Sequence, residues 1–458
     1  MSTDLLSRQL IRQLLAQREA LQGPALGVRE QVRRHIVDAV AIGWAATACQ
    51  PLSSQLVKAM GMGVSGGACS VFGSAQALPP TLAAFANAAL IHTLDFDDIH
   101  DTARLHPTAV TLPAALAAAQ WVSAPMDRVI DAVALGSELM CRLGVMYSPQ
   151  GNGPGSDWFL TQLFGYFGAA LSAGVVMGLD EDALVSALGF AYMQAAGGKE
   201  AGFGVGATGR SIYPAFAAMG GVNAVQLASA GLSGPASALD GAANLFRIYL
   251  ERDPHPAQIE QLLYPDAWAF SATQIKPWPS CRLSHPYVAT AMELRRVLGG
   301  EALASLNVAV NASAAKLCAP LPERRRPTTL QDAKYSIPYM TAFALLHGEV
   351  DLNNLQLETL GDARVHAIAD QIEVSPTLPD NPGHPPAQLH AVTTSGREIW
   401  VTAPAFDLDP AGVRSKFECC LTYAGLGAQA DGAWAALQDM ERAPNVNVLF
   451  DTALWAPR

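Results

Sequence analysis

Hydrophobic positions recur every three or four residues through the first 270 residues of the chain. Between Val28 and Cys49, for example, Val32, Ile36 and Val40 follow the helical period. The same pattern predicts helices at Leu82–Leu90, Ala114–Val122, Asp127–Met146, Leu160–Met177, Glu181–Ala196 and Ser211–Ala230. Many inner positions are Ala or Gly, which lets helix axes approach closely and predicts a compact all-helical domain.

The pattern changes from about residue 273 onward. Residues 306–310 alternate between apolar and polar side chains, as in a half-buried strand, and residues 371–374 and 389–393 behave similarly. The turn signal Ser395-Gly396 leads into residues 398–402, which predicts a hairpin. Helical patterns at Pro286–Leu298 and Ser336–Leu346 lie between the strands, so this part should be a smaller α+β domain.

The tail, Ser415–Leu437, returns to the helical period and is expected to rejoin the first domain. The chain is therefore predicted to be mainly α. Its large all-helical domain is built from both chain ends, residues 1–272 and 404–458, and residues 273–403 form the smaller α+β domain.

Composition narrows the class of protein. Half of the 458 residues are apolar and 15% are charged, which favours a large buried core over disorder. The net charge of −11 offers no basic surface for nucleic acid or an anionic membrane. The seven cysteines form no CxxC pair, and the N-terminus lacks the pattern of a secretory signal. No apolar run reaches the roughly 18 residues of a membrane span, so we expect a soluble cytoplasmic protein.

The segment His92–Asp101 contains two histidines and four aspartates within ten residues, in strongly apolar surroundings. Arg104 and His106 follow, and Pro107 opens the next helix. A loop that joins two buried helices and carries many titratable groups is a natural wall for an active site. A metal site is an alternative, although no two histidines show the spacing of a zincin motif, and a helix-capping network is another. The spacing favours acid/base chemistry.

A second cluster, Lys276–Pro286, falls where helical character gives way to mixed character. A domain junction is a preferred place for a pocket, and Lys276 and Arg282 could pair with substrate carboxylates. A lysine near other cations can also act as a base. Two alternatives stay open at this point: a simple surface turn, and a thiol nucleophile at Cys281 beside His285.

The glycine-rich segment from Gly202 to Arg210 superficially resembles a nucleotide-binding loop. The GxGxxG pattern requires a preceding strand, whereas a helical run precedes this segment, and no Walker motif is present. Nucleotide binding is therefore rejected. We expect the glycines to shape a loop that delivers Arg210 or Lys199 to a pocket.

Taken together, four segments resemble the signatures of the MmgE/PrpD family, in family order. They are His35–Asp38, Leu94–Asp98 with His106-Pro107, Lys276–Pro286 and Lys334–Tyr339. The family includes 2-methylcitrate dehydratase, cis-aconitate decarboxylase and iminodisuccinate epimerase. The resemblance covers nearly the whole chain and implies a helical domain from both chain ends, a lid domain between them, and an active site in the cleft. It also implies a homodimer and neither a metal nor an organic cofactor.

The resemblance also implies which residues carry the chemistry. The residues that align with the site of the decarboxylase branch are Asp95, His106, Lys276 and Tyr339, expected to be catalytic. Substrate-binding positions are expected at Ile99, Phe159, Arg210, Cys281, Arg282 and His285. Arg210 stands where that branch has a lysine. Three positions depart from it: Ile99 replaces a threonine, and Phe159 and Cys281 replace histidines. The loss of these polar groups alters which substrate oxygens can be satisfied.

The implied activity is that of a lyase, a dehydratase or decarboxylase that acts next to a carboxylate of a small di- or tricarboxylic acid. An epimerase that removes and returns an α-proton is the first alternative, and a non-catalytic carboxylate-binding homologue is the second. The expected partner is a small polycarboxylate substrate, with no nucleic acid and no membrane.

Overall fold

The computed structural model describes residues 5–147, 156–202, 208–380 and 386–455. The protein is mainly α, with a small α+β part, as the sequence predicts. The chain folds as two compact units. Of the described residues, the helical unit comprises 5–147, 156–202, Gly209–Ile275 and 414–455, and the mixed unit comprises Thr208, 276–380 and 386–413. The chain passes between the units at 275/276 and 413/414, three and ten residues after the expected 272/273 and 403/404.

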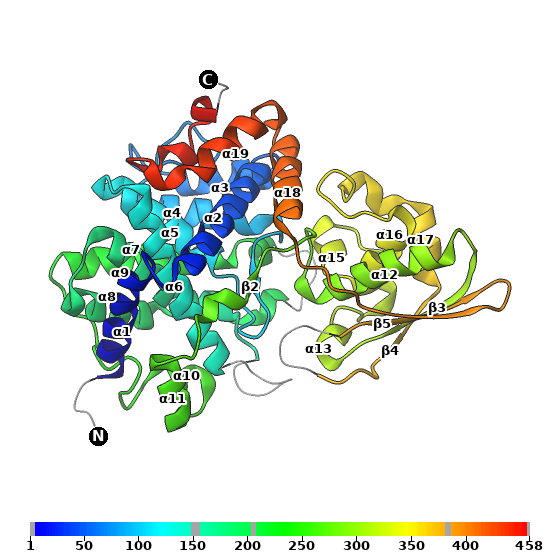
Figure 1. The fold of residues 1–458 in the computed structure, drawn as a ribbon, viewed down its shortest axis with the longest axis horizontal. Coiled ribbons are helices and arrows are strands. Elements are labelled where there is room, and N and C mark those ends of the chain that lie inside the picture. The colour runs from blue at the N-terminus through cyan, green and yellow to red at the C-terminus, as the bar shows by residue number, and fades with distance from the viewer. Residues whose placement is uncertain (1–4, 148–155, 203–207, 381–385, 456–458) are drawn as a thin grey trace. The chain divides into compact units, whose positions relative to one another are not determined.

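The helical unit is a bundle organised around one apolar helix (Figure 1). Its helices before the mixed unit are α1 (Leu6–Ala20), α2 (Leu26–Ala46), α3 (Leu52–Gly61), α4 (Pro80–Thr93), α5 (Thr108–Val122), α6 (Met126–Tyr147), α7 (Leu160–Met177), α8 (Glu181–Gln194), α9 (Tyr213–Ser229), α10 (Leu245–Leu250) and α11 (Pro256–Leu263). Helix α7 packs against α5, α6, α8 and α9. Of the described helices, α7 is long and apolar enough to cross a membrane, and 94% of it is buried inside the structure.

Small residues let the central helices approach closely, as their frequency in the sequence predicts. A Cβ atom added to Gly136 on α6 would lie 2.4 Å from the main-chain oxygen of Gly168 on α7. Only a residue without a side chain fits such a crossing, so glycine is required at this point of the α6–α7 contact.

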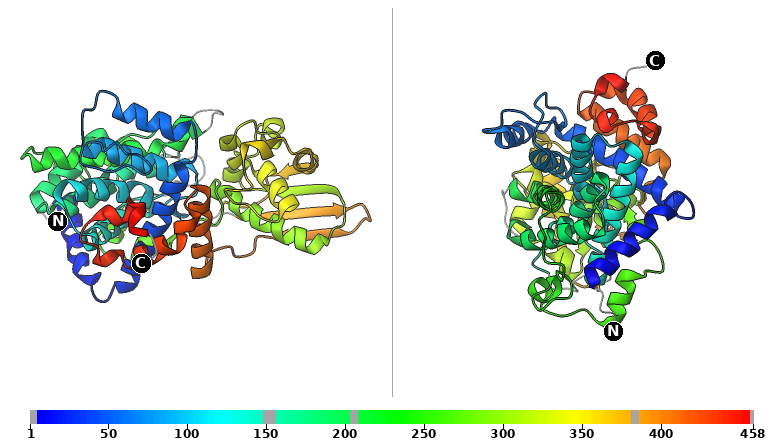
Figure 2. Two further views of the ribbon diagram at one scale, coloured as in Figure 1. Left: turned by 90° about the horizontal axis from the view of Figure 1, so that it is seen from above. Right: turned by 90° about the vertical axis from the view of Figure 1, so that its left-hand side faces the viewer.

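The C-terminal segment rejoins the helical unit. Helix α18 (Pro410–Tyr423) enters it from Arg414 onward, and α19 (Ala430–Gln438) follows after a turn at Gly425, whose φ is 76°. The segment packs on α2, since the Trp44 indole donates to the carbonyl of Leu449 at 3.0 Å. Both views in Figure 2 show the red C-terminal helices within the same helical body as the blue N-terminal ones. The predicted helical stretch Ser415–Leu437 is thus divided into two helices, because the left-handed Gly425 ends the first one.

The segment between α4 and α5 is not a simple loop. Residues Ile99 and His100 form strand β1 (Ile99–His100), which pairs antiparallel with β2 (Thr273–Gln274). Ile99 lies opposite Gln274, and His100 lies opposite Thr273. This pairing anchors the loop between α4 and α5 to the residues that directly precede Lys276.

The mixed unit is a four-stranded sheet with helices on it. The strands are β3 (Leu303–Ala309), β4 (Ile372–Ser375), β5 (Gln388–Thr393) and β6 (Glu398–Thr402), in the order β4-β3-β5-β6. Strands β3 and β4 are parallel, and the β5–β6 hairpin turns through Gly396, whose φ is 86°. The helices are α12 (His285–Leu298), α13 (Ala312–Ala315), α14 (Leu321–Arg325), α15 (Leu330–Lys334), α16 (Ile337–His347) and α17 (Ala363–Asp370).

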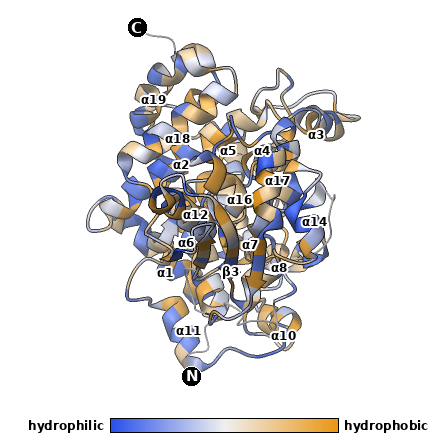
Figure 3. Cartoon of the chain, turned by 90° about the vertical axis from the view of Figure 1, so that its right-hand side faces the viewer, coloured by the Kyte–Doolittle hydropathy of each residue, from blue (hydrophilic) through white to orange (hydrophobic). Residues whose placement is uncertain are grey.

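Helix α12 packs on β5, β6 and α16. Burial alternates along β5 and β6, so that one face of the hairpin joins the core under α12. The hydropathy colours of Figure 3 match this arrangement, with α16 largely hydrophobic and α14 largely polar. The predicted alternation of residues 389–393 therefore reports the real orientation of this strand.

Candidate active site

The acidic segment, Asp95–Asp101, begins at a strained residue. Helix α4 ends at Leu94, and Asp95 adopts a left-handed conformation with φ 56°, while its N–H donates to the carbonyl of His92 at 2.9 Å. Aspartate tolerates this region better than most residues, but it still costs energy. The turn directs the chain away from the helix and lets the next three residues enter the interior of the helical unit.

Three aspartates of this segment are buried inside the helical unit. Asp95, Asp97 and Asp98 are 3%, 1% and 2% exposed. Burial of a carboxylate is costly unless donors compensate it. The groups around Asp97 and Asp98 therefore compensate the burial of these two carboxylates.

Asp98 fixes the start of the following helix. Its Oδ2 accepts from the Thr108 hydroxyl at 2.5 Å and lies 2.8 Å from His35 Nδ1, and its Oδ1 accepts from the Thr108 N–H at 3.3 Å. The first N–H groups of a helix lack partners within the helix, so Asp98 caps α5 from ten residues earlier. A capping network, one of the alternatives considered from the sequence, is present here, and Asp98 supplies it through Thr108.

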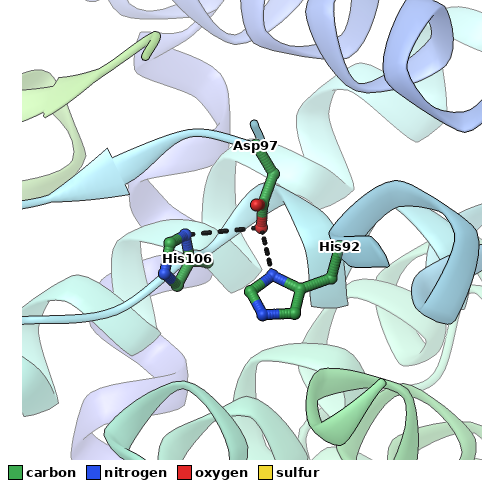
Figure 4. Close-up of side chains that lie close together, drawn as sticks. All are labelled: His92, Asp97 and His106. Carbon is green, nitrogen blue, oxygen red and sulfur yellow. Dashed lines mark hydrogen bonds and ion pairs between the residues drawn. The ribbon is translucent and has the colours of Figure 1, made fainter. Parts of the chain in front are cut away.

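Asp97 lies between two histidines (Figure 4). Its Oδ2 is 2.8 Å from His92 Nδ1 and 3.3 Å from His106 Nδ1. His106 Nδ1 also donates to the main-chain carbonyl of Asp98 at 2.6 Å. The side chain of His106 is 12% exposed, compared with 2% for His92 and 1% for Asp97. Among these three side chains, His106 is therefore the one that solvent or a substrate can reach most easily.

The same three residues are the group within the described chain that could hold a metal ion. One ligand atom of each lies within 4.8 Å of the others. A ligating imidazole nitrogen must offer a lone pair, however, and a nitrogen 2.6 Å from a carbonyl oxygen carries a proton instead. The contact of His106 Nδ1 with the Asp98 carbonyl thus favours proton chemistry over metal binding through that atom.

A second layer supports the histidines. The main-chain N–H of His106 donates to the Thr161 hydroxyl at 3.1 Å, and the Tyr213 hydroxyl donates to the same oxygen at 3.4 Å. The ring of Tyr213 packs edge-on against His92 and stacks on Phe159 with centroids 4.0 Å apart. Burial raises the pKa of Tyr213 well above its usual range, so it stays a neutral donor. Phe159 is thereby connected to the histidine pair through Tyr213.

His100, from the same segment, has a structural role. Its Nε2 donates to the Ala269 carbonyl at 2.9 Å, and its Nδ1 accepts from the Ala103 N–H at 3.1 Å. Burial lowers its pKa, which keeps the ring neutral. Both ring nitrogens are engaged by the main chain, so this histidine braces β1.

Two other expected site residues of the helical unit, Ile99 and Arg210, have surroundings different from those of the histidines. Ile99 is buried in β1, with 5% exposure. Arg210 is partly buried, and its Nη1 donates to the Gly202 carbonyl at 3.0 Å. The glycine-rich stretch before it, residues 203–207, lies outside the described residues.

The mixed unit carries the second predicted cluster. Lys276 is completely buried, and Arg282 is 7% exposed, with its guanidinium 4.9 Å from the centroid of the Phe406 ring. His285 is buried, with Nε2 3.2 Å from the Ser280 carbonyl. Cys281 is half-buried, and its N–H donates to the Lys334 carbonyl at 3.0 Å. This segment is a folded part of the unit, and the interpretation as a surface turn is wrong.

Tyr339 lies in the core of the mixed unit. It is fully buried among apolar side chains, and its hydroxyl donates to the Thr359 carbonyl at 3.3 Å. Burial raises the pKa of its hydroxyl well above the usual range. These contacts are those of a tyrosine that stabilises the core of the mixed unit.

Reasoning from the sequence missed His92, Asp97 and Tyr213 as site residues. His92 and Asp97 were visible as members of the dense segment, but their spacing alone did not identify which carboxylate faces which ring. Tyr213 begins α9 and carried no signal in the sequence, because only the fold brings it to His92.

Comparison with known proteins agrees with this architecture. Residues 16–258 match the MmgE/PrpD N-terminal domain, and residues 278–402 match the MmgE/PrpD C-terminal domain. A cis-aconitate decarboxylase of Aspergillus terreus is 29% identical over 344 residues, which cover 70% of this chain and 68% of the relative. The human cis-aconitate decarboxylase is 25% identical over 386 residues, covering 82% and 76%. These similarities support an enzyme, and the chain belongs to the MmgE/PrpD family.

Proposed function

We propose that the protein is a lyase that removes water or carbon dioxide next to a carboxylate of a small di- or tricarboxylic acid. The observation that carries the proposal is the placement of His106, which is partly exposed while its Nδ1 is held by a buried carboxylate and a main-chain carbonyl. The relatives of this protein that are named cis-aconitate decarboxylase support the lyase class.

The proton moves through His106 in this proposal. With Nδ1 protonated, the lone pair of the neutral ring is on Nε2, which can remove a proton from the substrate or return one. The ring becomes an imidazolium in the first case, and the buried carboxylate of Asp97 stabilises that charge. Asp95, whose left-handed turn lies two residues before Asp97, shares or orients the proton in this proposal.

Cations bind the substrate carboxylates and stabilise the charge that develops beside them. Lys276 and Arg210 have this role, and Arg282 can form two parallel hydrogen bonds with a carboxylate. Charge builds up next to a carboxylate as a proton or carbon dioxide leaves, so fixed positive groups lower the barrier.

Apolar residues then restrict the choice of substrate. Ile99 and Phe159 are unable to accept or donate hydrogen bonds, and Cys281 does so only weakly. A substrate oxygen that meets these side chains stays unsatisfied, at a cost of about 1–3 kcal/mol. We therefore propose a polycarboxylate with fewer or differently placed polar groups than cis-aconitate.

The test is a substrate panel of citrate, methylcitrate, aconitate and iminodisuccinate analogues, followed by NMR in deuterated buffer. We expect loss of water or carbon dioxide from one of them, unaffected by a chelator. The variants His106→Gln and Lys276→Ala should fold and lose at least about 100-fold in turnover. His390→Gln, on the sheet of the mixed unit, is the control and should retain turnover.

Two results would contradict the lyase proposal. Deuterium incorporation into the substrate without loss of water or carbon dioxide would instead identify an epimerase. Wild-type turnover in both His106→Gln and Lys276→Ala would remove the assigned site.

A further inference from the structure

We infer that Asp97 and His92 are positioning residues of this site: Asp97 orients the His106 ring together with the Asp98 carbonyl and stabilises its protonated form, and His92 holds the Asp97 carboxylate. The inference rests on the proposed function for its kinetic consequences. Its structural part, the state of the His106 ring, can be measured without any substrate.

The tautomer follows from the partners of His106 Nδ1. Two oxygens lie near this nitrogen, the Asp98 carbonyl at 2.6 Å and Asp97 Oδ2 at 3.3 Å. A carbonyl and a carboxylate are both acceptors, so the nitrogen between them must be the donor. The neutral ring therefore carries its proton on Nδ1, and Nε2 is the basic atom.

The charge of Asp97 matters as well as its geometry. Its side chain is 1% exposed, so water screens its attraction to the His106 ring only weakly. When His106 accepts a proton, the resulting imidazolium lies beside a fixed carboxylate. This stabilisation is stronger in the charged intermediate than in the resting state, and it should therefore increase kcat rather than substrate affinity.

His92 holds the carboxylate in place. Its Nδ1 lies 2.8 Å from the same Oδ2, and its ring is wedged edge-on between His106 and Tyr213, with centroids 5.0 and 4.9 Å away. Because Oδ2 faces both rings, rotation of the Asp97 carboxylate would break two contacts together. His92 thus acts on His106 through Asp97.

The kinetic test uses near-isosteric variants. Asp97→Asn keeps the shape and removes the charge, so kcat should fall by about 100-fold with less than about a threefold change in KM. Asp101→Asn, in the same segment, is the matched control and should retain wild-type kcat. A purely structural role for Asp97 would instead lower Tm and the yield of folded protein, with kcat per folded molecule unchanged, and would overturn the inference.

A pair of variants at His92 separates holding from proton transfer. The side-chain amide of His92→Asn can still donate to Asp97 from near the position of Nδ1, whereas His92→Leu offers no donor. We expect His92→Asn to retain most of the kcat that His92→Leu loses. Equal loss in the two variants would contradict a positioning role, because a donor at that place would then not suffice.

The direct readout is ¹⁵N NMR of the histidine rings without substrate, with the His106 signals identified by their absence in His106→Gln. Wild-type protein should show a protonated Nδ1 and an unprotonated Nε2 at alkaline pH. The opposite tautomer would overturn the inference even if lyase activity is found. If no carboxylate is turned over but this tautomer is observed, the proposed function fails while the arrangement around His106 stands, because the Asp98 carbonyl and Asp97 hold Nδ1 independently of substrate.

Discussion

The ammonium group of Lys416 donates a hydrogen bond to the main-chain carbonyl of Phe96, 320 residues earlier in the chain, at 2.8 Å. The same group forms a buried ion pair with Asp38 Oδ1 at 2.7 Å and lies 3.9 Å from the centroid of the Phe96 ring. Phe96 stands between Asp95 and Asp97. A residue of the C-terminal segment therefore fixes the backbone that carries the candidate site, which gives the return of the chain to the helical unit a functional consequence.

Replacement of Lys416 by Met should strongly destabilise the helical unit. Asp38 would then be a buried carboxylate without its cation, and removal of one partner of a buried pair costs about 3–5 kcal/mol. We expect a clear fall in Tm, measured by circular dichroism. Unchanged Tm in Lys416→Met would show that the Asp38 carboxylate finds another partner.

The double variant Asp38→Leu/Lys416→Met separates stability from positioning. Apolar replacement of both partners of a buried ion pair is often nearly neutral for stability. The hydrogen bond to Phe96 is still lost, so we expect nearly restored Tm but roughly tenfold lower kcat, since small displacements of catalytic groups reduce rates strongly. Full recovery of both quantities would mean that Lys416 has no part in holding the segment.

The pH dependence of stability should show a contribution from Asp38. Burial raises the pKa of Asp38 to about 6, although Lys416 opposes this. The folded protein thus retains a proton that the unfolded chain loses near pH 4, and the contribution of Asp38 to stability falls as pH rises through about 6. We expect the free energy of unfolding of wild type minus that of Asp38→Asn to decrease by about 2 kcal/mol from pH 4 to 6.5. A difference that rises with pH would contradict the raised pKa.

The α6–α7 crossing predicts a size limit at Gly136. The Cβ of Gly136→Ala would lie 2.4 Å from the main-chain oxygen of Gly168, which is unable to rotate away. Overpacking of this kind costs about 1–3 kcal/mol, so urea should unfold the variant at a lower midpoint. Gly27→Ala on α2, where an added Cβ meets nothing within 4 Å, is the control and should be neutral or stabilising. Equal midpoints for the two variants would show that the helices can move apart.

Much of the fold was predictable from the sequence because helical periodicity is a local signal. Helix α7 and strand β6 coincide with the predicted ranges, and α6, α9, α12 and α16 differ from them by one or two residues at an end. Helix α5 begins six residues before the predicted Ala114. Strand β1 was missed because it has two residues and its partner strand lies far along the chain. Nothing local marks such a pairing, which is settled by packing of the completed unit.

The candidate site was predictable as a segment but not as an arrangement. The density of charges in an apolar context identified the stretch from His92 to Pro107. The left-handed turn at Asp95, with φ 56°, then decides where each following side chain points, and it directs Asp97 rather than a neighbour at the two histidines. The direction of the side chains after such a turn depends on tertiary contacts, including the hydrogen bond from Lys416 to Phe96. The spacing of residues in the sequence does not predict it.

Phe159 offers a prediction about substrate choice. Its ring stacks on Tyr213 at 4.0 Å and 14°, in the layer that supports the histidine pair, and by family resemblance it stands where the decarboxylase branch has a histidine. Phe159→His keeps an aromatic ring on Tyr213 and adds polar atoms, so a substrate oxygen left unsatisfied by Phe159 would gain a partner. We expect kcat/KM for cis-aconitate to rise by about tenfold and that for the natural substrate to fall, measured in parallel on the substrate panel. Phe159→Leu removes the stacking ring without adding a polar atom and serves as the control, because an equal gain there would attribute the change to space rather than to hydrogen bonding.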